Sequence, residues 1–213
     1  MPTNEQLIQD IARPLYQDHG PNQWPHIQRV VSTAKDMATK ANRRIDDATL
    51  AALYLHDAAK SRMQDYPTVK DHGVASAILA RAVLKGKLPN RTVATAANAI
   101  AEHNMDVPPR SLASDTLMSA DANIPDLEFL ARKSYLWSKR NGLRGNALLD
   151  NVLNAVKNRT VASGRKYVPT LYSTVYAPEI AQLRRRAAAT RREDLRGIIR
   201  NAMTKYKDMD PHA

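Results

Sequence analysis

A histidine–aspartate pair at the end of an apolar run constrains the fold more than any other feature of this chain. Residues 50–55 read Leu-Ala-Ala-Leu-Tyr-Leu, and His56 and Asp57 follow directly. A helix that is apolar on every side is expected to be buried, and an unpaired buried imidazole or carboxylate costs several kcal/mol. Other parts of the chain must therefore bring polar partners to this position.

Three further histidines and one aspartate are suitable partners, because each lies within a predicted helix or at its end: His26, His72, His103 and Asp121. Imidazoles and carboxylates that converge from rigid helices can hold a metal ion, and a bridging carboxylate can hold two ions about 3.5–4 Å apart. The chain has no cysteine, which excludes disulfides, thiolate catalysis and cysteine-bound zinc. We therefore expect one or two divalent ions, with iron or manganese favoured over magnesium, zinc, nickel or cobalt.

Helical periodicity dominates the chain, and no segment shows a convincing strand alternation. The pattern predicts a helix that starts at Asp46 or Asp47 and carries the histidine–aspartate pair, and further helices over residues 4–17, 23–41, 71–83, 89–103, 111–121, 125–140, 146–162 and 178–205. Within 71–83 the predicted core stripe is Val74, Ile78 and Ala82, with Val83 as a further candidate. We predict an all-α helical bundle with a metal-binding domain over residues 1–170 and a basic helical extension over residues 171–213.

Composition places the chain among soluble globular proteins, since 43% of its 213 residues are hydrophobic and 25% are charged. No apolar stretch approaches the roughly 18 residues of a membrane span, and the first residues show no secretory signal. We therefore expect a cytoplasmic protein with no membrane partner.

The positive charge is concentrated towards the end of the chain. The formal net charge is +11, and residues 181–213 hold nine Lys and Arg against four Asp and Glu. The positive electrostatic field of such a segment attracts polyanions, but it does not select one class of polyanion over another. A solvated helix face is the simplest interpretation, and binding of nucleic acid or an acidic partner is the alternative. Aromatic residues that could stack on single-stranded bases are scarce in this segment.

Five short segments resemble, in order and in helix placement, the motifs of the HD phosphohydrolase superfamily. They cover roughly residues 20–130 and read His26-Ile-Gln-Arg-Val30, Leu55-His-Asp-Ala-Ala-Lys60, Asp71-His-Gly73, Ala101-Glu-His103 and Ser119-Ala-Asp-Ala-Asn123. The resemblance implies that His26, His56, Asp57 and Asp121 bind one metal ion. It implies further that Asp57 bridges to a second ion, which His72 and His103 hold.

The resemblance also implies roles for charged residues beside these ligands. Lys60 is similar to a lysine that lies near substrate phosphate, so Asp57 and Lys60 are the predicted catalytic residues. Arg29, one helical turn from His26, is suited to bind a phosphate through its guanidinium group. Asp71, Glu102 and Asn104 neighbour the ligands and are candidates for fixing a histidine tautomer. His19, Asp106 and His212 are expected to be solvated or turn residues.

The leading hypothesis is a metal-dependent phosphohydrolase that uses a metal-activated hydroxide on a nucleotide or dinucleoside polyphosphate. The run His-Asp-x-Ala-Lys, followed by His-Gly and a later histidine, most resembles the bacterial symmetrical diadenosine tetraphosphatases. Ala58 departs from that branch, in which a bulkier residue is usual, and the match ends near residue 130. Two alternatives stay open: a phosphodiesterase or nuclease that acts on cyclic dinucleotides or nucleic acid, and a non-catalytic nucleic-acid-binding module.

Overall fold

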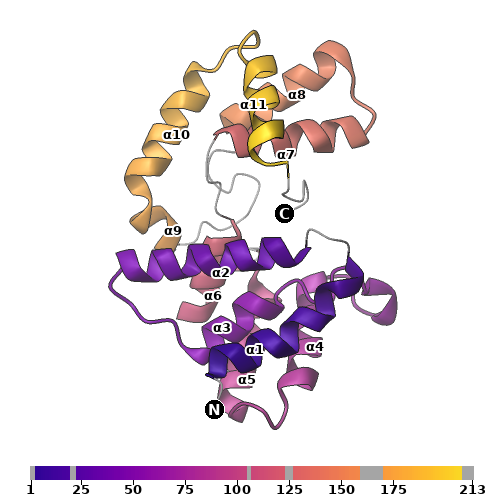
Figure 1. The fold of residues 1–213 in the computed structure, drawn as a ribbon, viewed down its shortest axis with the longest axis vertical. Coiled ribbons are helices and arrows are strands. Elements are labelled where there is room, and N and C mark those ends of the chain that lie inside the picture. Colours follow the sequence, from indigo (N-terminus) through magenta and orange to yellow (C-terminus); the bar gives the residue numbers. More distant parts are fainter. Residues whose placement is uncertain (1–2, 20–22, 105–106, 123–126, 159–169, 208–213) are drawn as a thin grey trace. The chain divides into compact units, whose positions relative to one another are not determined.

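The computed structural model describes residues 3–19, 23–104, 107–122, 127–158 and 170–207, and its fold is all-α, as predicted (Figure 1). The chain divides into two compact units. The first unit comprises Met1–Ala122 and Arg165–Val175, and the second comprises Asn123–Gly164 and Tyr176–Ala213. Asp106 and His212 lie outside the described residues, as does the side chain of His19.

The first unit is built around one fully buried helix. Its helices are α1 (Asn4–Ala12), α2 (Gln23–Lys40), α3 (Asp47–Leu55), α4 (His72–Leu84), α5 (Asn90–Glu102), α6 (Leu112–Asp121) and the short α9 (Thr170–Val175), with 3-10 helices at Arg13–His19 and Met63–Asp65. Every residue of α3 from Ala48 to Leu55 is buried, and α3 packs against α1, α2, α4, α5 and α6. The apolar run therefore forms the centre of this unit, as its composition requires.

Several helix starts lie where the sequence indicates them, because local side chains cap them. Asp46 accepts a hydrogen bond from the Thr49 amide at 2.8 Å, and Asp71 accepts from the Gly73 amide at 2.7 Å. These contacts satisfy amides that have no acceptor within the helix. The opening helix is shorter than the predicted residues 4–17, since it becomes a 3-10 helix at Arg13. Pro14 explains the change, because proline cannot continue the α-helical hydrogen bonds.

The predicted core stripe of α4 is wrong. Val74 and Ile78 are 40% and 46% exposed, and Ala82 is exposed as well. The buried face is offset around the helix and is formed mainly by small residues: Gly73, Ala75, Ser76, Ala77, Ala80 and Leu84. Small side chains let α4 approach its neighbour α5 closely, so packing favours them over the larger apolar residues that the periodicity singled out.

The second unit has a core of its own. It contains α7 (Leu127–Arg140), α8 (Gly145–Asn158), α10 (Ala177–Ala189) and α11 (Leu195–Lys205). Many of its buried apolar residues form one cluster: Leu127, Leu130, Ala131, Leu148, Val152, Val156, Leu183, Ala187, Leu195 and Ile199. The two units thus meet along the chain after Ala122, Gly164 and Val175, whereas the sequence suggested a single boundary near residue 170. The short α9 belongs to the first unit because it packs against α2 and α6.

The predicted single basic helix over residues 178–205 is also wrong. The chain leaves the helix at Thr190, which has an extended conformation with φ −65° and ψ 126°. The Arg191 amide then donates to the Asp194 carboxylate at 3.0 Å, and α11 begins at Leu195. This break allows Leu183 on α10 and Ile199 on α11 to pack into the same core. Within the described ranges, no helix is both long enough and apolar enough for a membrane span.

Candidate metal centre

The six predicted ligands lie at or near helix ends of the first unit, and the structure brings them together. His26 is in the first turn of α2, and His56 and Asp57 directly follow α3. His72 is the first residue of α4, His103 directly follows α5, and Asp121 is the last residue of α6. The turn after Asp57 is tied to α4, because the Ala59 amide donates to the Ser76 hydroxyl at 3.0 Å. Packed helices therefore fix the backbone of each ligand.

Asp57 lies at the centre, and its two carboxylate oxygens face different histidine pairs. Oδ2 lies 3.7 Å from His26 Nε2 and 3.8 Å from His56 Nε2. Oδ1 lies 3.2 Å from His72 Nε2 and 3.7 Å from His103 Nε2. The ligand atoms form two groups that share Asp57, and within each group they lie within 4.8 Å of one another. A carboxylate in this position can serve two ions.

Asp121 completes the first of these groups. Its Oδ1 lies 3.5 Å from His26 Nε2 and 3.8 Å from His56 Nε2. Its side chain is 15% exposed, whereas that of Asp57 is 3% exposed. The first group is thus two histidines and two carboxylates, and the second is two histidines and the shared carboxylate.

The spacing of these atoms fits ligands arranged around a cation. Most of the nitrogen–oxygen distances exceed the roughly 3.2 Å limit of a good hydrogen bond. Two atoms that are each about 2.1 Å from a common ion lie roughly 3–3.5 Å apart. His56 Nε2 is fully buried and has no hydrogen-bond partner among the residues that the structure describes, which is rare for a polar atom in a folded protein. An ion at this place would satisfy it, so the residues present fit a metal site.

Backbone carbonyls fix the tautomers of two histidines. His56 Nδ1 lies 3.0 Å from the Leu53 carbonyl oxygen, and His103 Nδ1 lies 2.6 Å from the Ile100 carbonyl oxygen. Because a carbonyl can only accept, each Nδ1 carries the proton and donates it. Nε2 of both neutral rings then presents a lone pair towards Asp57. A ring in this tautomer can bind a metal ion through Nε2. The sequence gives no sign of these carbonyl contacts.

The residues expected to fix histidine tautomers have other contacts. Glu102 accepts from the Ser114 hydroxyl at 2.6 Å, which links α5 to α6. Asn104 donates to Asp71 at 2.6 Å, and Asp71 caps α4. Glu102, Asn104 and Asp71 therefore hold together the helix ends that carry the ligands. Their contacts position the helices and not the imidazole rings themselves.

Gly73 is a further residue of the site, and in the sequence it stands out only as part of the motif Asp71-His-Gly73. A Cβ atom at this position would lie 2.9 Å from His103 Nδ1 and 3.0 Å from Asp71 Oδ1. Real Cβ atoms do not approach other atoms so closely, so only glycine lets His103 lie against the first turn of α4. Its position directly after His72 was the available signal.

Two cations contact the ligands of the first group. Arg29 Nη2 lies 2.9 Å from His26 Nδ1. Because a guanidinium only donates, Nδ1 accepts in this contact and the proton of the neutral ring is on Nε2. Binding of a metal ion through His26 Nε2 therefore requires the ring proton to move to Nδ1 and Arg29 to give up this contact. Lys60 Nζ lies 2.7 Å from Asp57 Oδ2, and its side chain is 38% exposed. Both predicted phosphate-binding residues therefore reach the site. Their contact with a substrate stays a prediction.

Burial and mutual contacts shift the ionisation of His26, His56 and Asp57 towards the forms that bind a metal, whereas His103 shifts in the opposite direction. Desolvation lowers the pKa of His26 to about 3 and also lowers the pKa of His56. Burial opposes ionisation of Asp57, but His56, His103, His72 and Lys60 outweigh it and hold the Asp57 pKa well below its usual value. Burial likewise opposes protonation of His103, yet its contact with Asp57 raises the His103 pKa. His26 and His56 are thus neutral and Asp57 is charged at neutral pH.

The His26 pKa makes the metal-free protein sensitive to mild acid. Its value is about 3 in the folded state and about 6.5 in an unfolded chain. The unfolded state therefore binds the proton first, and stability falls as the pH drops from about 6.5 to about 3, by up to roughly 1.4 kcal/mol per pH unit. We expect urea midpoints of the metal-free protein to fall over this range.

The variant His26→Asn isolates this contribution from that of His103, whose raised pKa has the opposite effect on stability. Between pH 6.5 and 4, the free energy of unfolding of this variant should depend less steeply on pH than that of the wild type, by up to roughly 1.4 kcal/mol per pH unit. Urea midpoints measure this difference. Identical pH slopes in the two proteins would show that His26 is not held neutral by folding.

Comparisons with known proteins find that part of this chain is similar to one domain family. Residues 24–126 match the model of the HD domain, and this range contains all six candidate ligands together with Arg29 and Lys60. A solved structure described as a predicted HD superfamily hydrolase from an uncultured Thermotogales bacterium is 19% identical. The match covers 86% of this chain and 91% of that chain, with a TM-score of 0.49. No curated protein matches. None of these findings distinguishes the diadenosine tetraphosphatase branch.

Proposed function

We propose that this chain, whose residues 24–126 match the HD domain, is a metal-dependent phosphohydrolase that acts on a nucleotide or dinucleoside polyphosphate. The observation that carries the proposal is the shared position of Asp57 between two histidine pairs. Divalent ions bound there would supply Lewis acidity towards both a phosphoryl oxygen and the attacking water. His26, His56, Asp121 and one oxygen of Asp57 would hold one ion. His72, His103 and the other oxygen would hold the second.

The burial of the ligands indicates how a substrate approaches. His26, His56 and His103 are at most 6% exposed, so they form the floor of the site. The side chains of His72 and Lys60 are 28% and 38% exposed. Substrate phosphate is therefore expected to enter from the side on which His72 and Lys60 meet solvent. A buried floor excludes water and strengthens the electrostatic interactions that orient the phosphate.

Lys60 is expected to act on the phosphate rather than on the metal. Its ammonium group is close enough to contact Asp57 and exposed enough to contact a ligand that enters from solvent. The variant Lys60→Gln removes the charge that balances the phosphoryl oxygens, and we expect phosphate release to fall roughly 100-fold while metal content is retained. Lys85→Gln, at the far end of α4, is the matched control. Loss of metal from Lys60→Gln would contradict this role.

A substrate screen tests the proposal as a whole. The purified protein is analysed for metal content and assayed for phosphate release from nucleotides and dinucleoside polyphosphates with added Mn²⁺ or Fe²⁺, beside Asp57→Asn. Symmetrical cleavage of diadenosine tetraphosphate would give two molecules of ADP and would support the finer assignment. Substoichiometric metal without turnover of any of these compounds would overturn the proposal in favour of a binding module.

A phosphodiesterase or nuclease is the second candidate, favoured by the net charge of +11. Deleting residues 181–213 would be a poor test, because Leu183, Leu195 and Ile199 belong to the core of the second unit. Substituting exposed arginines such as Arg184 and Arg185 keeps that core intact. Turnover of DNA or RNA that falls with these substitutions would favour the nuclease.

A further inference from the structure

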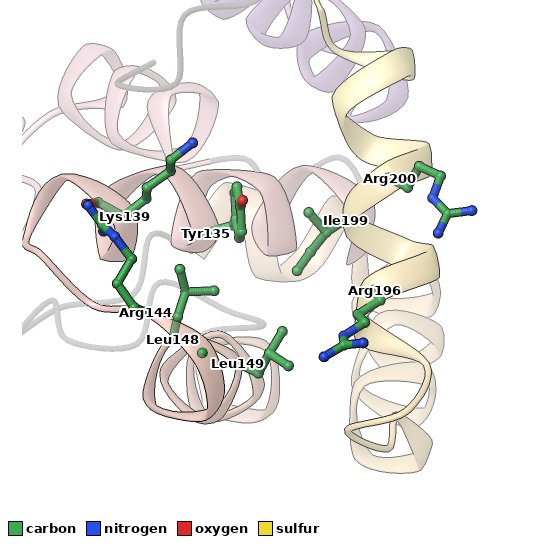
Figure 2. A pocket seen from close by; sticks show the side chains of 9 residues that line it. Tyr135, Lys139, Arg144, Leu148, Leu149, Arg196, Ile199 and Arg200 are labelled. Carbon is green, nitrogen blue, oxygen red and sulfur yellow. The ribbon is translucent and has the colours of Figure 1, made fainter.

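A pocket in the second unit contains none of the metal-centre residues. It lies between α7, α8 and α11 and has a cavity volume of about 400 Å³. Figure 2 shows its lining side chains, which come from three segments of the chain. Ligand pockets are typically of roughly 300–1,000 Å³, so this one is large enough for a single nucleotide.

The floor of the pocket is apolar. Leu148 and Ile199 are buried in the core of the second unit, and Tyr135 and Leu149 pack against that core. In Figure 2 these four side chains lie between the cationic residues of the two sides. Such a floor suits a flat, weakly polar group and gives a bare phosphate ion nothing to contact.

Cations line the rim, and the described residues that line the pocket include no carboxylate. Lys139 and Arg144 lie at one side and Arg196 at the opposite side, whereas the Arg200 guanidinium points away from the centre (Figure 2). Among the residues that the structure describes, none of these four cations forms an ion pair. Other arginines of the second unit do form ion pairs: Arg186 pairs with Glu128, and Arg192 pairs with Asp150. The charge of the pocket is therefore available to a ligand.

Two backbone features prepare one side of the pocket for an anion. Arg144 Nη1 donates to the carbonyl oxygens of Lys139 and Leu143, at 2.9 and 2.8 Å. These bonds hold the guanidinium in place and leave its remaining N–H groups to bind a ligand. Gly145, which also lines the pocket, begins α8 with φ +53°. The first amides of a helix have no partner within it and favour an anion.

We propose that this pocket binds a nucleoside 5′-phosphate, with the phosphate on the side of Arg144 and Lys139, the base on the apolar floor, and Arg196 facing the nucleotide from the opposite side. Arginine pairs with phosphate through two parallel hydrogen bonds, which fixes both position and charge. The concave shape and the size of one nucleotide favour a mononucleotide over a nucleic-acid strand. The site is separate from the proposed catalytic one, so either assignment can fail without the other.

Calorimetric titration of the full-length protein with AMP tests the assignment. The double variant Arg144→Glu/Arg196→Glu should lose at least about tenfold in affinity, because the charge-assisted contact of Arg144 with the phosphate becomes repulsive and the charge of Arg196 across the pocket is reversed. Arg184→Glu/Arg185→Glu makes the same change in net charge on exposed residues of α10 outside the pocket and should change affinity by less than about twofold at physiological salt. Phosphate release at the metal centre should be unchanged in both variants.

Two further measurements separate a nucleotide site from simpler alternatives. Ribose 5-phosphate should bind at least about tenfold more weakly than AMP, since it lacks the base that covers the floor. Leu149→Trp, which fills the floor without a change in charge, should abolish AMP binding. Equal affinity for the two ligands, equal losses in the two arginine variants, or no AMP binding at millimolar concentration would each overturn the proposal. Tighter binding of a single-stranded oligonucleotide that weakens equally in both variants would indicate general electrostatic attraction instead.

Discussion

Replacing Asp57 by asparagine is expected to abolish both metal binding and phosphate release while the helices remain folded. Each oxygen of this carboxylate faces one histidine pair, at 3.2–3.8 Å, so one substitution removes a ligand from both groups. Asparagine keeps the volume of the side chain, and α3 is held by its apolar contacts. Circular dichroism should therefore stay unchanged while metal content and turnover fall below detection.

Thermal unfolding provides a second readout that does not depend on activity. An ion at about 1,000 times its dissociation constant stabilises the folded state by about 4 kcal/mol. Added Mn²⁺ should raise the melting temperature of the wild type and leave that of Asp57→Asn unchanged. Asp46→Asn is the matched control, because it removes one charge and asparagine still caps a helix. Stoichiometric metal and full turnover in Asp57→Asn would remove the basis of the proposed function.

Replacing Gly73 by alanine is expected to destabilise the protein and to empty the second group of ligands. Alanine is normally the better residue in a helix by roughly 0.5–1 kcal/mol. Here its Cβ would lie 2.9 Å from His103 Nδ1, and such overpacking costs about 1–3 kcal/mol. His103 must move from its place beside Asp57 and the Ile100 carbonyl. Metal content should fall by about half, since only the group that contains His72 and His103 is disturbed.

Gly197→Ala is the control for this substitution. Gly197 lies in α11, and a Cβ at this position would meet nothing within 4 Å. The control should be slightly more stable than the wild type, so the two glycine variants should change stability in opposite directions. Urea unfolding and elemental analysis measure both effects. A Gly73→Ala protein that is as stable as the wild type and holds its full metal content would show that His103 tolerates the added methyl group.

The parts of this structure that the sequence predicts well depend on local signals. Asp46, Asp71 and Ser111 cap α3, α4 and α6 where the pattern places them, because a cap involves only residues two or three positions away. The order of the five motifs was enough to predict that the six candidate ligands lie close together. The all-α fold follows from periodicity that runs through most of the chain.

The parts that it predicts badly depend on contacts between distant segments. Val74 and Ile78 form a good apolar stripe, but small residues on the adjacent face pack against α5. Residues 178–205 have helical periodicity throughout, but Thr190 ends α10 so that α10 and α11 share one core. Likewise, the Leu53 and Ile100 carbonyls that fix two imidazole rings are backbone atoms, which no pattern of side chains can identify.

The unequal exposure of the histidines has a consequence for how metal analyses of this protein are interpreted. His26 and His56 are almost completely buried, whereas the side chain of His72 is 28% exposed. An ion coordinated partly by a solvent-accessible ring exchanges with competing chelators sooner than one enclosed by the interior. Purification can therefore yield one ion per chain even when the chain holds two in the cell. A stoichiometry near unity would not distinguish one site from two, so counting the sites requires reconstitution with excess ion.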